Sequence, residues 1–310
     1  MKRLRLLLLA AVPVIATASV YLLAPEDSGA GRAGPDLSTA YRAQAAENAE
    51  DAEGAKTWAE QTRSASYEQV IGDVPPGLAA PAGKELAQQL VASAENSTLD
   101  WRSAYAYIED IGDGQGYTAG LIGFCTGTHD LLTLVERYTK AHPGNGLARY
   151  LPALREVDGS DSHEGLDPGF TAAWKAEARQ PAFRKAQDAE RDRVYFDPAV
   201  RLAKLDGLGV LGQFVYYDAM VFHGPGTDAT SFYGMRERAL EKADSPTGGG
   251  SEKAYLEAFL DIRRAAMKTR DADIDTSRVD TAQRRFLDEG NLDLRTPLEW
   301  QVYGETYRVP

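Results

Sequence analysis

The stretch LGQFVYYDAMVF, residues 211–222, is apolar or aromatic at almost every position. A helix that is apolar on all sides is buried in a protein core rather than laid on its surface. Its one charged residue is Asp218, and a buried carboxylate is tolerated only when a cation and hydrogen bonds compensate it. Arg263 and Arg278 lie in similarly mixed apolar surroundings. The sequence therefore predicts a buried Arg–Asp–Arg cluster, which either holds the fold or supports catalysis.

Outward from this stretch the pattern is mainly helical, because apolar residues recur at helical spacing and breakers such as Pro143 and Gly290 end the segments. We expect a first helix that ends near residue 95 and further helices over residues 131–141, 146–157, 170–193, 198–222, 232–243, 252–270 and 278–289. Residues 113–124 are rich in glycine with alternating apolar residues, which predicts a short strand or hairpin. The predicted class is mainly α with one small β element.

The chain has 310 residues, a formal net charge of −12 and a single cysteine, Cys125. The negative charge argues against nucleic-acid binding, since affinity for phosphates comes from clustered Lys and Arg, and it suits a neutral or cationic partner. One cysteine excludes an internal disulfide and a multi-cysteine zinc site. The four histidines lack the spacing of metal ligands.

Three segments are expected along the chain. Basic residues at positions 2, 3 and 5 precede an uncharged stretch over residues 6–24, which is typical of an export signal and also long enough to remain as a membrane anchor. Residues 25–83 are rich in Ala and acidic residues, which predicts a mostly disordered linker or propeptide. The predicted domains are therefore 1–24, 25–83 and a globular unit over residues 84–310.

Two carboxylates form the first candidate for chemistry. Glu95 lies at the margin of the apolar face of the first predicted helix, and Asp113 lies among Gly112, Gly114 and Gly116. A carboxyl on a helix edge that faces another on a nearby strand is how a glycosidase places its acid and its base. The same two residues also fit a solvated helical Glu and a turn Asp, and without further context this ordinary interpretation is favoured.

The glycines around Asp113 also match the dinucleotide fingerprint G-x-G-x-x-A over residues 114–119. That fingerprint should open a helix within a βαβ unit, and the segment before it is helical, so we set it aside. Neither G-x-S-x-G nor HExxH occurs in the sequence.

Longer motifs extend across the predicted globular unit. They include SAENSTLDW at 93–101, YIEDIGDG at 107–114, YLPAL at 150–154, RDRVYFDPA at 191–199 and DTSRVD at 275–280. Together these motifs resemble the chitosanases of glycoside hydrolase family 46, and in particular their secreted actinobacterial type. The resemblance covers essentially the whole of residues 84–310.

The resemblance implies a two-lobed, lysozyme-like α+β fold, mainly α, with a small β-sheet and a substrate cleft between the lobes. It implies endo-acting, inverting hydrolysis of the β-1,4 glucosamine linkages of chitosan, with Glu95 as general acid, Asp113 as general base and Thr118 orienting the attacking water. It also implies substrate binding by Asp130, Tyr107, Glu109 and Tyr195, and a supporting network of Asp218, Arg263 and Arg278. This chemistry needs no metal or cofactor, and we expect a secreted monomer whose partner is the polycation chitosan.

The sequence departs from the family at a few positions. Gln115 stands where close relatives carry Arg, and Arg270 and Ile274 stand where some relatives carry acids. We therefore expect one contact near the catalytic base to differ and one outer subsite to be weaker.

Two other functions remain open. A lysozyme-like peptidoglycan hydrolase would share the architecture, although hydrolases of the anionic cell wall tend to be basic whereas this chain is acidic. A non-catalytic glycan-binding protein would share the cleft, although it would be free to lose Glu95, Asp113 and Thr118.

Overall fold

The interior of the protein is organised around one helix, α9 (Val210–His223), in which every residue from Leu211 to His223 is buried. The computed structural model describes residues 72, 74–112 and 114–310. The helix buries apolar surface on all its sides, so it can lie only where other elements surround it.

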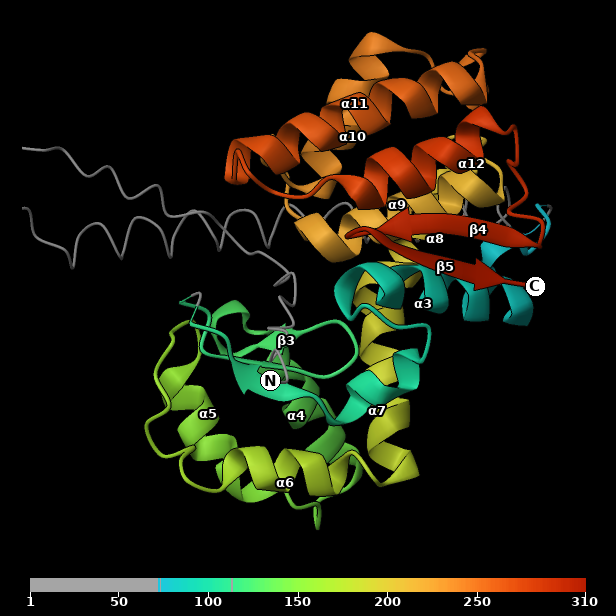
Figure 1. Cartoon of the computed structure of the whole chain (residues 1–310). Helices are drawn as coiled ribbons and strands as arrows, with labels where there is room; N and C mark the ends of the chain where they lie inside the picture. The colour runs from blue at the N-terminus through green and yellow to red at the C-terminus, as the bar shows by residue number, and fades with distance from the viewer. Residues whose placement is uncertain (1–71, 73, 113) are drawn as a thin grey trace, which may run out of the picture.

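The described chain forms two lobes (Figure 1). The first lobe surrounds α9 and contains η1 (Gly77–Ala79), α3 (Pro81–Glu95), α8 (Asp197–Leu205), α10 (Phe232–Lys242), η6 (Pro246–Gly248), α11 (Glu252–Arg270), η7 (Arg278–Gln283), α12 (Arg284–Asp288), β4 (Leu298–Val302) and β5 (Glu305–Val309). The second lobe contains η2 (Trp101–Ala106), β1 (Ile108–Asp110), β2 (Tyr117–Ala119), β3 (Phe124–Cys125), η3 (Thr126–Thr128), α4 (Asp130–Ala141), η4 (Ala148–Tyr150), α5 (Leu151–Val157), α6 (Phe170–Glu177) and α7 (Pro181–Arg191). The π-helical segment η5 (Asp192–Phe196) continues α7 into α8, so one long helical path joins the lobes. The predicted two-lobed, mainly α, lysozyme-like class with a small β-sheet is confirmed.

The second lobe carries a three-stranded antiparallel sheet in the order β1–β2–β3. Its middle strand places Thr118 opposite Glu109 on one side and Cys125 on the other. The glycine-rich stretch predicted as a strand or hairpin supplies β2, β3 and the loop before them.

Several elements differ from the prediction. The expected helix over 170–193 is divided at Gln180, which is extended because it precedes Pro181, and a residue before proline is disfavoured in a helix. The expected helix over 198–222 is divided at Gly207, whose φ of +79° ends α8. The hairpin β4–β5 corrects the prediction of a single β element. Its alternating buried residues (Leu298, Trp300 and Val302) are the signal that was missed.

Packing begins before residue 84, where the sequence places the start of the globular unit. Leu78 is fully buried and its backbone N–H donates a hydrogen bond to Oε1 of Gln213 at 2.9 Å. The predicted signal or anchor and most of the predicted linker lie outside the described residues. Within the described part of the chain, no helix is long and apolar enough to cross a membrane.

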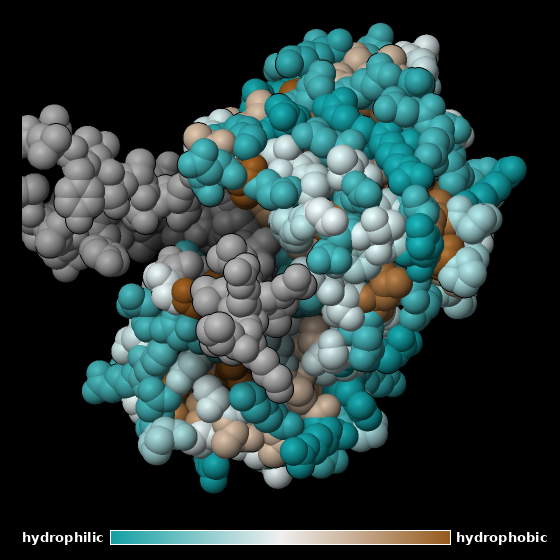
Figure 2. Space-filling view, in the orientation of Figure 1, coloured by the Kyte–Doolittle hydropathy of each residue, from teal (hydrophilic) through white to brown (hydrophobic). Residues whose placement is uncertain are grey.

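Apolar side chains of both lobes lie inside, whereas hydrophilic side chains prevail on the face that Figure 2 shows. The largest fully buried side chains include Trp174 and Phe183 in the second lobe and Trp300 and Phe259 in the first. Each lobe therefore has apolar packing of its own, and polar contacts join the lobes at α7.

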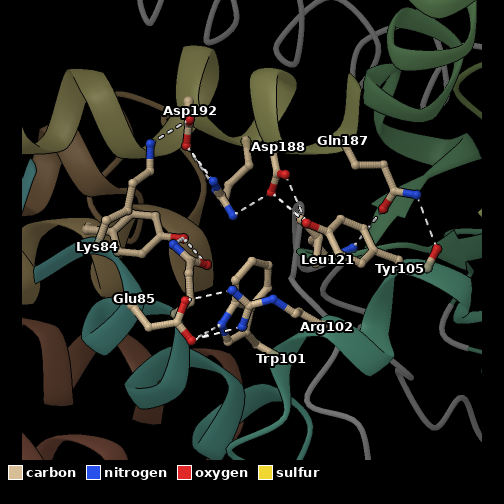
Figure 3. Close-up of polar contacts among 12 residues, drawn as sticks. Lys84, Glu85, Trp101, Arg102, Tyr105, Leu121, Gln187, Asp188 and Asp192 are labelled. Atoms are coloured by element: carbon tan, nitrogen blue, oxygen red, sulfur yellow. Dashed lines mark hydrogen bonds and ion pairs between the residues drawn. The ribbon is translucent and has the colours of Figure 1, made fainter. Parts of the chain in front are cut away.

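A polar cluster at this junction includes Lys84, Tyr105, Asp188 and Asp192 (Figure 3). The buried guanidinium of Arg191 lies at its centre. It lies 3.0 Å from Oδ1 of Asp188 and 2.8 Å from Oδ1 of Asp192. Asp188 also accepts a hydrogen bond from the hydroxyl of Tyr105, and Asp192 pairs with Nζ of Lys84 at 2.6 Å. Since Tyr105 belongs to η2 and Lys84 to α3, Arg191 links both lobes through its two carboxylates.

We expect Arg191→Ala to lower the free energy of unfolding by about 3 kcal/mol, because it leaves two carboxylates without their shared cation. The value lies at the low end for a broken buried pair, since the side chains of Asp188 and Asp192 are 33% and 24% exposed. Urea denaturation measures it. The control is Arg155→Ala, whose exposed pair with Glu136 should be worth less than about 1 kcal/mol. Equal losses in the two variants would contradict the role of Arg191.

Candidate active site

Glu95 is the last residue of α3, and its side chain is only 6% exposed. At that end of a helix a carboxylate meets the negative pole of the helix dipole. Burial raises the pKa of Glu95, and only part of the increase is offset by the guanidinium of Arg278. The end of α3 is anchored from the C-terminal hairpin, since Nε1 of Trp300 donates a hydrogen bond to Oγ of Ser93 at 2.9 Å. The carboxyl of Glu95 is thus held in a protected position that favours its protonated form.

Arg278 binds two carboxylates at once. Its Nη1 lies 2.7 Å from Oε1 of Glu95, and its Nη2 lies 2.7 Å from Oδ1 of Asp218. The other oxygen of Asp218 lies 2.7 Å from Nη1 of Arg263. The four buried side chains therefore form one continuous chain of ion pairs, Glu95–Arg278–Asp218–Arg263. The structure brings together the three residues that the sequence grouped and places them directly behind Glu95.

The charges in this network adjust one another. Burial alone would raise the pKa of Asp218, but Arg278 and Arg263 lower it to about 2. Burial opposes the charge on Arg278 too, yet Asp218 and Glu95 raise its pKa above the usual range. Burial lowers the pKa of Arg263 to about 10. Asp218 and both arginines are therefore charged at neutral pH, whereas burial shifts Glu95 towards its protonated form.

Two further residues complete the network, and sequence reasoning missed both. Nε2 of Gln283 donates a hydrogen bond to Oδ2 of Asp218 at 2.6 Å, and its Oε1 accepts one from Arg263 at 2.9 Å. The guanidinium of Arg278 lies over the ring of Phe222, 4.4 Å from its centroid. Gln283 lies five positions after Arg278 in a segment with many polar and charged residues, so the sequence offered no distinct signal for it.

Thr118 lies in the middle strand of the sheet, on the other lobe from Glu95. It is buried, and its Oγ1 lies 3.2 Å from Sγ of Cys125 on the neighbouring strand. Glu109, its partner across β1, is exposed. Among the residues that the structure describes, the hydrogen-bonding contact of the Thr118 hydroxyl is this thiol, a weak hydrogen-bonding group, so the hydroxyl can still bind a water strongly.

Asp130 and Tyr195 lie together beside this sheet. Asp130 begins α4, and its Oδ1 accepts hydrogen bonds from the backbone N–H of Cys125 at 2.8 Å and from Oγ1 of Thr128 at 2.6 Å. The hydroxyl of Tyr195, from η5, lies 3.4 Å from the other oxygen. Burial raises the pKa of Asp130 to about 6 despite these donors. An additional cation beside this carboxylate would stabilise its ionised form.

Tyr107 and the glycine-rich loop complete the sheet side. Tyr107 lies half-buried between η2 and β1, and its carbonyl accepts a hydrogen bond from Gly120 at 2.9 Å. Asp113 lies outside the described residues, so its separation from Glu95 stays a prediction. Its neighbours Gly112 and Gly114 both have positive φ.

The structure bears on two other kinds of site, a dinucleotide site at the glycine cluster and a metal site. Residues 114–119 lead into β2 rather than into a helix, so the dinucleotide fingerprint has the wrong context. Within the described residues, no three His, Cys, Asp or Glu side chains are grouped closely enough to hold a metal ion.

Comparisons with a family model, with known sequences and with solved structures all match the same family of proteins. Residues 89–298 match the model of glycosyl hydrolase family 46. A chitosanase from a Streptomyces species is 61% identical over 75% of this chain and 84% of its own, and one from a Nocardioides species is 55% identical over the same shares. A co-crystal structure of a chitosanase with substrate has a TM-score of 0.74 and 54% identity, and the match covers 76% of this chain and 100% of that one.

We expect Asp218→Asn to lower the free energy of unfolding by about 3–5 kcal/mol at neutral pH, because it leaves two buried guanidiniums with one carboxylate between them. Because the pKa of Asp218 is low, the stability that its charge provides depends on pH only in the acidic range. The stability it provides is complete above its unfolded pKa, about 3.9, and is lost as the pH falls towards its folded pKa of about 2. Denaturant unfolding between pH 2 and 7 measures both effects.

The control is Asp261→Asn, since Asp261 is exposed and its pair with Arg284 should contribute less than about 1 kcal/mol. If Asp218→Asn unfolds at the same denaturant concentration as the parent, Asp218 does not hold the network together.

Proposed function

The chain belongs to glycosyl hydrolase family 46, and from this premise we propose that it is a secreted, endo-acting chitosanase that cleaves β-1,4 glucosamine linkages with inversion. The relatives described as chitosanases support the substrate. The observation that carries the proposal is the buried chain of ion pairs that ends on Glu95, whose pKa burial raises. A carboxyl that keeps its proton at working pH is what a general acid requires.

In the proposed reaction, protonated Glu95 donates its proton to the glycosidic oxygen as the bond to the sugar breaks. Asp113 takes a proton from a water on the opposite face of the ring, and Thr118 orients that water. The water oxygen bonds to the anomeric carbon, so its configuration is inverted and the two carboxyl groups exchange protonation states. Arg278 supports the cycle because it balances the charge that remains on Glu95 after the transfer.

Substrate binding is assigned to the acidic and aromatic residues near the sheet. The carboxylates of Asp130 and Glu109 would attract the ammonium groups of glucosamine, and Tyr107 and Tyr195 would line the sugar path. The pKa of Asp130, raised to about 6, supports this role, since a bound cation would stabilise its ionised form. The net charge of −12 also favours a polycation over the anionic cell wall.

Secretion, a monomeric state and the absence of a cofactor remain parts of the proposal that come from the sequence. Residues 1–24 would direct export, as a cleaved signal or as an anchor, and residues 25–83 would link that segment to the catalytic unit. A lysozyme-like peptidoglycan hydrolase and a non-catalytic glycan-binding protein are the alternatives to be separated.

The first test compares substrates. We expect reducing ends to be released quickly from soluble chitosan, slowly from highly acetylated polymer and not from cell wall, with the α-anomer appearing first in the proton NMR spectrum. KM should rise with salt, because the attraction between carboxylates and ammonium groups is screened over about 10 Å at 0.1 M salt. Equal rates on chitin and chitosan would support the lysozyme-like alternative, and binding without cleavage would support the glycan-binding one.

The second test concerns the acid. Glu95→Gln should reduce kcat on chitosan by about 10²–10⁴-fold, because the amide cannot donate the required proton. The free energy of unfolding should change by less than about 1 kcal/mol, since the amide resembles the protonated carboxyl in shape and charge.

The rate of the parent enzyme should fall as the pH rises through the raised pKa of Glu95, because the acid form is then lost. The residual rate of Glu95→Gln should lack this alkaline decline. A variant that keeps most of the parent turnover would overturn the assignment of Glu95. Asp113→Asn is the companion variant. It should alter the fall in rate at low pH, because that side of the pH–rate profile reports protonation of the general base.

A further inference from the structure

Three glycines in the loop between β1 and β2 have a backbone conformation that side chains rarely adopt. Gly112, Gly114 and Gly116 have φ values of +74°, +81° and +67°. At Gly112 and Gly114 a Cβ would meet only open space. These two glycines therefore serve the backbone path rather than close packing, and such a path costs conformational entropy to hold in one place. Contacts from outside the loop can lower this cost.

One imidazole, that of His163, contacts both residues that flank this loop. Its Nε2 lies 3.1 Å from Oδ2 of Asp110, the last residue of β1. Its ring stacks on that of Tyr117, the first residue of β2, with centroids 4.0 Å apart and an angle of 9° between the planes. A single side chain thus spans the start and the end of the loop.

The contact with Asp110 extends into the loop. The other oxygen of Asp110, Oδ1, accepts a hydrogen bond from the backbone N–H of Gly112 at 2.8 Å. Asp110 thus contacts His163 through one oxygen and the backbone of Gly112 through the other, so a change at His163 reaches the residue directly before position 113.

His163 is itself held in place by its own segment. Its carbonyl accepts hydrogen bonds from the backbone N–H groups of Leu166 at 2.9 Å and Asp167 at 3.3 Å. Its Nδ1 lies 3.5 Å from Oδ2 of Asp167, whose Oδ1 accepts a hydrogen bond from the hydroxyl of Tyr117 at 2.6 Å. His163, Asp167 and Tyr117 form a closed set of contacts, so the imidazole has a defined orientation.

We propose that His163 is a positioning residue for the general base, because it contacts both residues that flank the loop to which Asp113 belongs. This inference rests on the proposed function, in which Asp113 is that base. His163 acts only through the loop. A displacement of about 1 Å in a catalytic group costs up to about 10²-fold in rate. The backbone N–H of Tyr117 also donates a hydrogen bond to Oγ1 of Thr126, so the end of the loop keeps one contact without His163. We therefore expect the loss of rate on removing His163 to be smaller than about 10²-fold.

The experiment uses the full chain and soluble chitosan. His163→Ala should lower kcat by about 3- to 10-fold, with KM within about twofold of the parent value, because the loop positions the base rather than the bound sugar. His163→Phe keeps a ring for Tyr117 but loses the nitrogen that faces Asp110, so its kcat should be close to that of His163→Ala. Circular dichroism and the melting temperature should show that both variants fold. The imidazole is partly exposed, so the melting temperature should change little.

The control is His142→Ala. His142 also lies against a tyrosine, Tyr138, with centroids 5.0 Å apart, but at the far end of α4 and away from the loop. Its kcat and KM should equal those of the parent.

A double variant separates positioning from a general structural effect. If His163 acts through Asp113, His163→Ala should cause no further loss of kcat in an Asp113→Asn background. Losses that multiply would mean that His163 acts elsewhere and would overturn the inference, as would parental kcat in both His163 variants. Failure of the parent to cleave chitosan would overturn the proposed function, and this inference with it. Cleavage by the parent, loss in Glu95→Gln and parental kcat in His163→Ala would overturn this inference alone.

Discussion

Asp218 carries its charge inside α9, where guanidinium nitrogens of Arg263 and Arg278 each lie 2.7 Å from one of its oxygens. A carboxylate buried at this depth would be protonated or would unfold the helix if either cation were absent. The requirement brings α11 and η7 against α9, and Arg278 then has a second nitrogen available for Glu95 at the end of α3. The position of the proposed acid is therefore a consequence of how the first lobe neutralises one internal charge.

The two lobes position the proposed acid and the proposed base in different ways. In the first lobe, Glu95 ends a helix that is anchored on both sides, by the bond of Ser93 with Trp300 and by the pairing with Arg278. In the second lobe, the proposed base belongs to a glycine-rich loop whose flanking residues, Asp110 and Tyr117, both contact His163. The inverting mechanism that we propose requires room for a water between the acid and the base, which here belong to different lobes. The Arg191 cluster links both lobes, so it bears on how the two sides are spaced.

Much of the fold could be predicted from local pattern. Residues 211–222 are apolar on every side, which indicates a central helix, and the structure buries each of them. The predicted helices were too long where Pro181 and Gly207 interrupt a continuous apolar pattern, because periodicity alone does not register a single breaker. The hairpin β4–β5 was missed although its strand alternates buried and less buried residues. Leu78 packs against the core through Gln213, a contact across the chain that composition could not indicate.

For the candidate site, the sequence by itself determined which residue types were available and where the charges were unusual. Asp218, Arg263 and Arg278 stood out because charge in an apolar segment has few stable solutions, and the long motifs pointed to Glu95 and Asp113. Only the tertiary structure decided that Arg278 joins Asp218 to Glu95, that Gln283 completes the network and that His163 bridges both ends of the glycine-rich loop. The reason is physical. A pKa and a contact depend on distance and burial, and residues far apart in the sequence, such as Asp218 and Arg278 with a separation of 60 positions, acquire these only when the chain has packed.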